Sequence, residues 1–144
     1  MIVLAGRIIA IDYGQKRVGL AVTDPEQIIA TSLTTVRSMD IIPFLKEYMK
    51  SEQVVTFVVG EPRQMNYEVS ESARFIGPFI KLLNKEFPDI PIVRVDERFT
   101  SKMAIRTIQE SGLKKKDRQD KALIDTVSAT LLLQSYLEQI ARAF

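Results

Sequence analysis

The 144-residue sequence contains no cysteine and no histidine. A disulfide framework, a cysteine–histidine zinc site, a thiol nucleophile and a Ser-His-Asp triad are therefore all excluded. Any catalysis must use carboxylates, lysine, tyrosine or hydroxyl side chains, or a metal ion that is held by oxygen ligands alone. Such oxygen-only sites favour Mg²⁺, Mn²⁺ or Ca²⁺.

Long apolar runs are missing as well. No run approaches the roughly 18 to 20 residues of a membrane span, and Met1–Ala5 is too short for the apolar part of a signal peptide. We therefore expect a cytoplasmic protein with no membrane partner. The chain is 46% hydrophobic and 26% charged, which predicts one soluble domain over residues 1–144. The net charge of +2 is too small to indicate a nucleic-acid partner by itself.

The pattern of apolar residues predicts an α/β fold. Strands are expected at residues 7–12, 17–23, 28–36, 54–60 and 92–95. Helices are expected at about residues 40–50, 69–87, 101–112 and 121–141, the first of them capped by Ser38 or Asp40. Short links join the first three strands, which predicts an antiparallel meander, whereas the last two strands each follow a helix and should run parallel to the first. The result is a five-stranded mixed sheet with helices on both faces.

The first predicted hairpin combines one carboxylate with two cations. Asp12 ends the first strand, Gly14 lies in the turn, where we expect a positive φ, and Lys16 and Arg17 follow at once. A carboxylate at a strand end beside cations can handle phosphate and a metal ion together. The alternative is a surface aspartate in an ordinary hairpin.

Further acids are expected at the same edge of the sheet. Glu61 directly follows the fourth strand, and Asp96 and Glu97 end the fifth. The carboxyl ends of parallel strands meet at one edge, which is where ligands bind in open α/β sheets. Together with Asp12, they place acids at the ends of three strands, which predicts a functional site.

A further acid, Asp125, lies in the last predicted helix, on a side that it shares with Ser128 and Ala129. An unpaired aspartate is costly to bury against a sheet. Asp125 must therefore pair with an arginine, cap a backbone group, or have its charge offset by a divalent ion. The small side chains of Ser128 and Ala129 would let the helix come close enough to deliver it.

Clustered carboxylates repel one another unless a cation lies between them. One or two Mg²⁺ or Mn²⁺ ions would relieve this repulsion and support an in-line phosphoryl displacement without histidine. A basic run, Lys114, Lys115 and Lys116 in the segment 114–121, either contacts phosphates or is a solvated loop.

Four segments carry a resemblance to a known family, and they span nearly the whole chain. They are residues 11–21, 58–62, 95–101 and 125–134, with Asp-Glu-Arg-Phe-Thr after a strand as the most specific piece. They resemble the YqgF/RuvX family, which has the ribonuclease H fold. The family was first linked to Holliday-junction resolution through similarity to RuvC, and it is tied to maturation of the 5′ end of 16S rRNA.

The resemblance implies a metal-dependent nuclease with a three-acid catalytic and metal-binding site: Asp12, Glu97 and Asp125. Asp96 could share or replace the role of Glu97. Glu61 stands where the family pattern favours an apolar residue, so its part in the site stays open. The cations expected to position phosphates are Lys16, Arg17, Arg98 and Lys114–Lys116.

The implied substrate is the 5′ end of pre-16S rRNA, free or within a pre-ribosomal particle. Branched DNA is the alternative, and its resolution would call for a symmetric dimer; the sequence does not decide between a monomer and a homodimer. Another alternative is a non-catalytic nucleic-acid-binding domain of the ribosome or transcription machinery. The Asp-x-Gly hairpin also resembles actin-like ATPases, but those need two such domains. Tyr13 could stack on a base, although packing under the hairpin is the simpler expectation.

Overall fold

The computed structural model describes residues 5–61, 73–96 and 121–143. Within them, five strands form one sheet in the order β3-β2-β1-β4-β5. The elements in chain order are β1 (Arg7–Tyr13), β2 (Arg17–Thr23), β3 (Ala30–Arg37), a 3₁₀ turn (Ser38–Asp40), α1 (Ile41–Tyr48), β4 (Val54–Glu61), α2 (Ala73–Glu86), β5 (Ile92–Asp96) and α5 (Lys121–Ala143).

The strand directions confirm the predicted mixed sheet. β1 pairs with β2 and β2 with β3 in the antiparallel sense, whereas β4 runs parallel to β1 and β5 runs parallel to β4. All five predicted strands are present, and their ends differ from the expected ends by two residues or fewer. The helix predicted at 101–112 and the first residues of the helix predicted from 69 lie outside the described residues.

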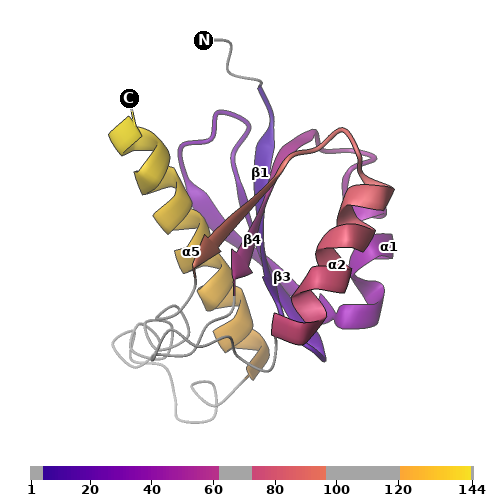
Figure 1. The fold of residues 1–144 in the computed structure, drawn as a ribbon. Coiled ribbons are helices and arrows are strands. Elements are labelled where there is room, and N and C mark those ends of the chain that lie inside the picture. The colour runs from indigo at the N-terminus through magenta and orange to yellow at the C-terminus, as the bar shows by residue number, and fades with distance from the viewer. Residues whose placement is uncertain (1–4, 62–72, 97–120, 144) are drawn as a thin grey trace.

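Helices cover both faces of the sheet. In Figure 1, α5 lies against one face, and α1 and α2 lie against the other. The alternation of side chains along β1 explains this arrangement, because Ile9 and Ile11 point into the core shared with α1 and α2, whereas Ile8 and Ala10 point into the core shared with α5. No helix in the described part of the chain is long and apolar enough to span a bilayer.

One local expectation at the hairpin turn was wrong. Gly14 does not have a positive φ. Its N–H instead donates to the carbonyl oxygen of Arg17 at 2.9 Å, and a Cβ at Gly14 would lie only 2.6 Å from that oxygen. The turn therefore requires glycine because there is no room for a side chain at this position.

The start of the first helix also differs from the expectation. It begins as a 3₁₀ turn, and the side chain of Asp40 makes no capping hydrogen bond to α1. The hydroxyl of Ser38 donates to the carbonyl oxygen of Gly14 at 2.6 Å, and the Ser38 N–H donates to the carbonyl oxygen of Lys16 at 3.0 Å. Ser38 therefore holds the hairpin turn and does not cap the helix.

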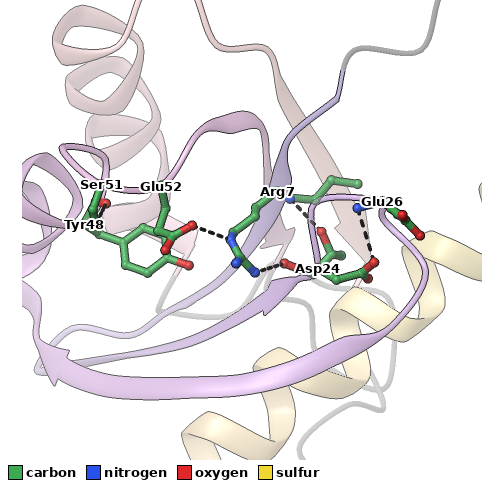
Figure 2. A network of polar contacts seen from close by, with 8 residues as sticks. Arg7, Asp24, Glu26, Tyr48, Ser51 and Glu52 are labelled. Carbon is green, nitrogen blue, oxygen red and sulfur yellow. Dashed lines mark hydrogen bonds and ion pairs between the residues drawn. The ribbon is translucent and has the colours of Figure 1, made fainter.

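A polar network fixes the opposite end of the β1–β2 hairpin (Figure 2). The guanidinium of Arg7 donates to the Glu52 carboxylate and to the carbonyl oxygen of Thr23, each at 2.9 Å. The Ile8 N–H donates to the hydroxyl of Thr23 at 2.9 Å. These bonds join the start of β1 to the end of β2 and to the link between α1 and β4.

The carboxylate of Asp24 shapes the link between β2 and β3. One oxygen accepts the N–H groups of Ile28 and Ile29 at 2.8 Å, and the other accepts the N–H of Glu26 at 3.2 Å (Figure 2 shows the Glu26 bond). These bonds, that from Ile29 first, hold the pKa of Asp24 below its ordinary value of 3.8. The ionised carboxylate thus stabilises the folded chain.

The Asp24 bonds predict a pH-dependent contribution to stability. Because the folded pKa is lowered, the contribution is present above the ordinary value of 3.8 and is lost as the pH falls through the folded pKa. Asp24→Asn keeps an acceptor but removes the charge, so the variant should be less stable at neutral pH. The difference in the free energy of unfolding, measured by urea denaturation from about pH 7 to about pH 3, should shrink toward the acid end. A constant difference would contradict this account.

Candidate active site

Asp12 lies near the end of β1, on the face of the sheet that α5 covers. It is two residues beyond Ala10, whose side chain belongs to the α5 core, and residues two apart share a face. The residue opposite Asp12 on β2 is Gly19. Asp12 is half-buried.

At Gly19 the backbone of α5 comes into close contact with the sheet. A Cβ at Gly19 would collide with the carbonyl group of Asp125 and would lie 3.1 Å from the Asp125 Cβ. Ser128 and Ala129, the predicted small residues, are both buried on the helix side. The sequence reasoning missed Gly19, although a glycine inside a strand is a signal of close backbone approach.

The shared neighbour Gly19 sets a limit on the separation of the two acids. Opposed Cβ positions in an antiparallel pair lie about 4.5 to 5.5 Å apart, so the Asp12 and Asp125 Cβ atoms are separated by at most about 8 to 9 Å. Each carboxylate extends beyond its Cβ, so the two can reach a common cation. Both are oxygen donors of the kind that Mg²⁺ and Mn²⁺ take.

The carboxylate of Asp125 is bound to an arginine. Its Oδ2 accepts a hydrogen bond from Nε of Arg17 at 2.7 Å, and the two side chains are 24% and 39% exposed. The sequence left open whether Asp125 pairs with an arginine or with a divalent ion, and in this structure the arginine is there. A partly exposed pair of this kind contributes about 1 kcal/mol or less, so a stronger ligand can replace it.

The hairpin end carries a group of cations. Lys16 is exposed in the turn that Ser38 holds, and Arg17 lies opposite Arg37 in the β2–β3 register. Arg37, which is exposed at the end of β3, was not among the predicted phosphate contacts. Lys16, Arg17 and Arg37 place positive charge beside Asp12 and Asp125 at the same edge.

The backbones of β4 and β5 end at this edge too. Ile11 of β1 pairs with Val59, and Glu61 pairs with Asp96, so the carboxyl ends of the three parallel strands coincide as predicted. The side chains of Glu61 and Asp96 are not described.

The remaining predicted site residues are Glu97, Arg98 and Lys114–Lys116, which lie outside the described residues. Within residues 5–61, 73–96 and 121–143, no three acidic side chains form a group that could hold a metal ion. Two of the three expected acids are therefore placed, and Glu97 is not.

Two further side chains near the site have clear environments. The ring of Tyr13 stacks on Phe79 with 4.2 Å between centroids, on the α2 face, so packing is the role that the structure gives it. Ser128 lies one turn beyond Asp125, and its buried hydroxyl has no hydrogen-bond partner among the described residues. A buried polar atom without a partner is rare in folded proteins.

Comparison with known proteins identifies the family. The family model described as "RuvX: Holliday junction resolvase" matches residues 6–139. The chain belongs to this family. Its ribonuclease H-like fold agrees with the observed sheet, and the expected resemblance is confirmed.

Curated relatives in the RuvX family match almost end to end. A protein of Bacteroides fragilis is 57% identical over 132 residues, which covers 92% of this chain and 96% of the relative. A protein of Porphyromonas gingivalis is 59% identical over 133 residues, with the same coverage. One of Flavobacterium johnsoniae is 56% identical over 131 residues, covering 91% and 95%. All three are named "Putative pre-16S rRNA nuclease".

The contact at Gly19 predicts a large effect of one methyl group. Gly19→Ala should destabilise the chain by about 1 to 3 kcal/mol, because the added Cβ would push α5 away from β2. Gly77→Ala in α2 is the matched control, since a Cβ there meets nothing within 4 Å. The control should change the free energy of unfolding, measured with urea, by less than about 1 kcal/mol. Equal effects of the two substitutions would contradict the close approach.

Proposed function

We propose that this RuvX-family chain is a metal-dependent endonuclease that hydrolyses phosphodiester bonds in the 5′ region of pre-16S rRNA, free or within a pre-ribosomal particle. The observation that carries the proposal is the placement of Asp12 and Asp125 on one sheet face across Gly19. The names of the relatives from Bacteroides fragilis and Porphyromonas gingivalis support the RNA substrate.

The oxygen donors present fit Mg²⁺ or Mn²⁺, as one ion or two. Asp12 and Asp125 would hold the metal together with Glu97, and Asp96 and Glu61 are further candidates at the same strand ends. When bound, such an ion supplies Lewis-acid activation and neutralises charge that develops on the phosphate. The chain's own acids provide its binding site, and no histidine is required.

Arg17 has two roles in this proposal. In the metal-free chain it neutralises Asp125 across a 2.7 Å hydrogen bond. With the Asp125 carboxylate engaged in metal binding, the Arg17 guanidinium would be available to a phosphate group, which it could bind through two N–H donors. Lys16 beside it, with Arg98 and Lys114–Lys116, would hold neighbouring phosphates and fix the register of the strand.

Resolution of branched DNA is a second candidate, because the matching family model carries the description "Holliday junction resolvase". The same acids and metal would serve that reaction, and a four-way junction in the cleavage assay separates the two substrates. A non-catalytic binding role is less favoured, since Asp12 and Asp125 both neighbour Gly19, which supports a shared role for the two acids.

Replacing either described acid should abolish cleavage. Asp12→Asn and Asp125→Asn should each lower the rate of cleavage of a 5′-extended 16S rRNA fragment by at least about a hundredfold, because metal binding is lost. Asp24→Asn, at the other end of the hairpin, is the matched control and should keep full activity. Chelation should stop the wild-type reaction, and added Mn²⁺ should restore it.

The same variants should remain folded. Asp125→Asn loses only a partly exposed ion pair, so its free energy of unfolding should change by about 1 kcal/mol or less. Relief of repulsion is not expected at Asp125, since its bonded neighbour is Arg17. Metal-dependent cleavage that survives in both Asp12→Asn and Asp125→Asn would overturn the proposed function.

The exposed lysine of the hairpin should contribute to RNA affinity through its charge. Lys16→Ala should weaken RNA binding and reduce the slope of log affinity against log salt by roughly 0.7 to 0.9, which corresponds to one lost phosphate contact. Lys50→Ala is the control, because Lys50 is equally exposed but precedes β4 at the far end of the sheet. RNA titrations at several salt concentrations measure the slope for each variant. If Lys16→Ala and Lys50→Ala gave the same slope, Lys16 would be a solvated surface residue without a phosphate contact.

A further inference from the structure

We infer that β3 is a dimerisation strand, which pairs antiparallel with β3 of a second copy of this chain around a two-fold axis between Leu33 and Thr34. The inference does not depend on the proposed nuclease activity. It rests on the position of β3 in the sheet, the direction of its backbone groups and the exposed side chains at its two ends.

Within the described residues, β3 is an edge strand that carries little of the charge that usually blocks pairing. Natural edge strands are protected by charges, proline, short length or a β-bulge, and of these β3 has a bulge and one terminal charge. β3 has eight residues, none of them buried, and its only charge is Arg37 at the last position. The other edge strand, β5, has five residues, of which Arg94 and Asp96 are charged.

Two hydrogen bonds at the hairpin turn define which way the backbone of β3 faces. The Gly14 N–H donates to the Arg17 carbonyl, so odd-numbered residues of β2 face β1 and even-numbered ones face β3. The bond from the Ser38 N–H to the Lys16 carbonyl agrees. In the second half of β3, from Thr34 to Arg37, the residue Arg37 therefore directs its own N–H and C=O away from β2.

An irregularity in the register reverses this pattern in the first half of β3, from Ala30 to Ser32. Thr34 pairs with Leu20 and Ser32 pairs with Ala21, so Leu33 is an extra residue that has no partner on β2. Beyond Leu33 the alternation shifts by one residue. Ala30 and Ser32 consequently direct their backbone groups outward.

The extra residue makes β3 complementary to itself. A two-fold axis between Leu33 and Thr34 sets Arg37 opposite Ala30 of the second copy, and both residues direct their backbone groups outward. It also sets Thr31 opposite Val36, on the face of the sheet that α1 and α2 cover in both copies. A regular strand could not pair with itself in this register, since an outward residue would meet an inward one.

Exposed apolar side chains flank β3 at both ends. Ile28 and Ile29 are 65% and 63% exposed, and Met39 is 70% exposed. Because Arg37 lies opposite Ala30 in this register, the segment before β3 that holds Ile28 and Ile29 would lie beside the 3₁₀ turn of the second copy that holds Met39, so apolar side chains would meet at both ends of the paired strands. The bonds from Asp24 already fix the backbone of Ile28 and Ile29, which lowers the cost of ordering them on association.

The geometry of the dimer follows from the axis, which is perpendicular to the sheet. Both copies of α5 would lie on the same face of a continuous sheet, and the edges that carry Asp12 would point in opposite directions. The two Arg37 side chains lie at opposite ends of the paired strands, so they do not repel each other.

Sedimentation equilibrium of the whole chain tests the inference, with concentrations up to about 0.1 mM so that a weak dimer is populated. Ile28→Glu and Met39→Lys should each weaken the dimer at least about tenfold, because each places a charge against an apolar side chain twice per dimer. The double variant should restore it to within about threefold, because opposite charges then face each other across the axis. Within one chain the two positions lie at opposite ends of β3 and cannot meet.

Leu82→Glu is the matched control. Leu82 is 42% exposed on α2, away from β3, and its substitution should leave the dissociation constant unchanged. Circular dichroism confirms that each variant is folded. The inference would be overturned if the wild-type chain stayed monomeric. It would also be overturned if Ile28→Glu and Met39→Lys left the dissociation constant unchanged, or if the double variant did not regain dimer affinity. These outcomes do not depend on the nuclease assays.

Discussion

The contact between the backbone of α5 and Gly19 is the constraint on which the candidate site depends. A helix that stood off by one side chain would carry Asp125 away from the sheet and from Asp12. The contact is formed by main-chain atoms, so it fixes the position of Asp125 more firmly than a side-chain contact would. A glycine in a strand has an entropic cost on folding, and at this position only glycine leaves room for the carbonyl group of Asp125.

The charge on Asp125 is neutralised by an arginine of the first hairpin. Arg17 acts as an internal counterion, held at 2.7 Å on a carboxylate that is only partly exposed. A pair worth about 1 kcal/mol or less reduces the affinity of a competing cation by a factor of about five at most. The pair would therefore be only a small obstacle to another cation at this carboxylate. Lys16 and Arg37 add positive charge at the same end of the sheet.

Much of the sheet could be predicted because it follows from local pattern and from connection rules. The apolar strands at 54–60 and 92–95 were found by composition, and their parallel direction followed from the helices that precede them. The common edge of β1, β4 and β5 followed in turn. Asp125 was recognised as an acid on a packed helix face, and three possible partners were stated for it, but the choice of Arg17 depends on two segments that meet only in the fold. No local signal could decide it.

Other features could not be predicted from the sequence, because they too depend on contacts between separate segments. The conformation of Gly14 is set by the carbonyl of Arg17, and Ser38 gives its hydroxyl to a turn on a different hairpin, so neither follows from residue preference alone. The extra residue Leu33 exists only relative to the register of β2. Glu97, Arg98 and Lys114–Lys116 remain predictions.

Ser38 has a mechanical consequence for the molecule. It is bonded by its hydroxyl and its N–H to the hairpin turn, and it is also the first residue of the turn that starts α1. The cationic tip and the helical layer on the far side of the sheet are thus tied through one residue. A displacement of the hairpin turn would therefore also displace the start of α1, because both are attached to Ser38.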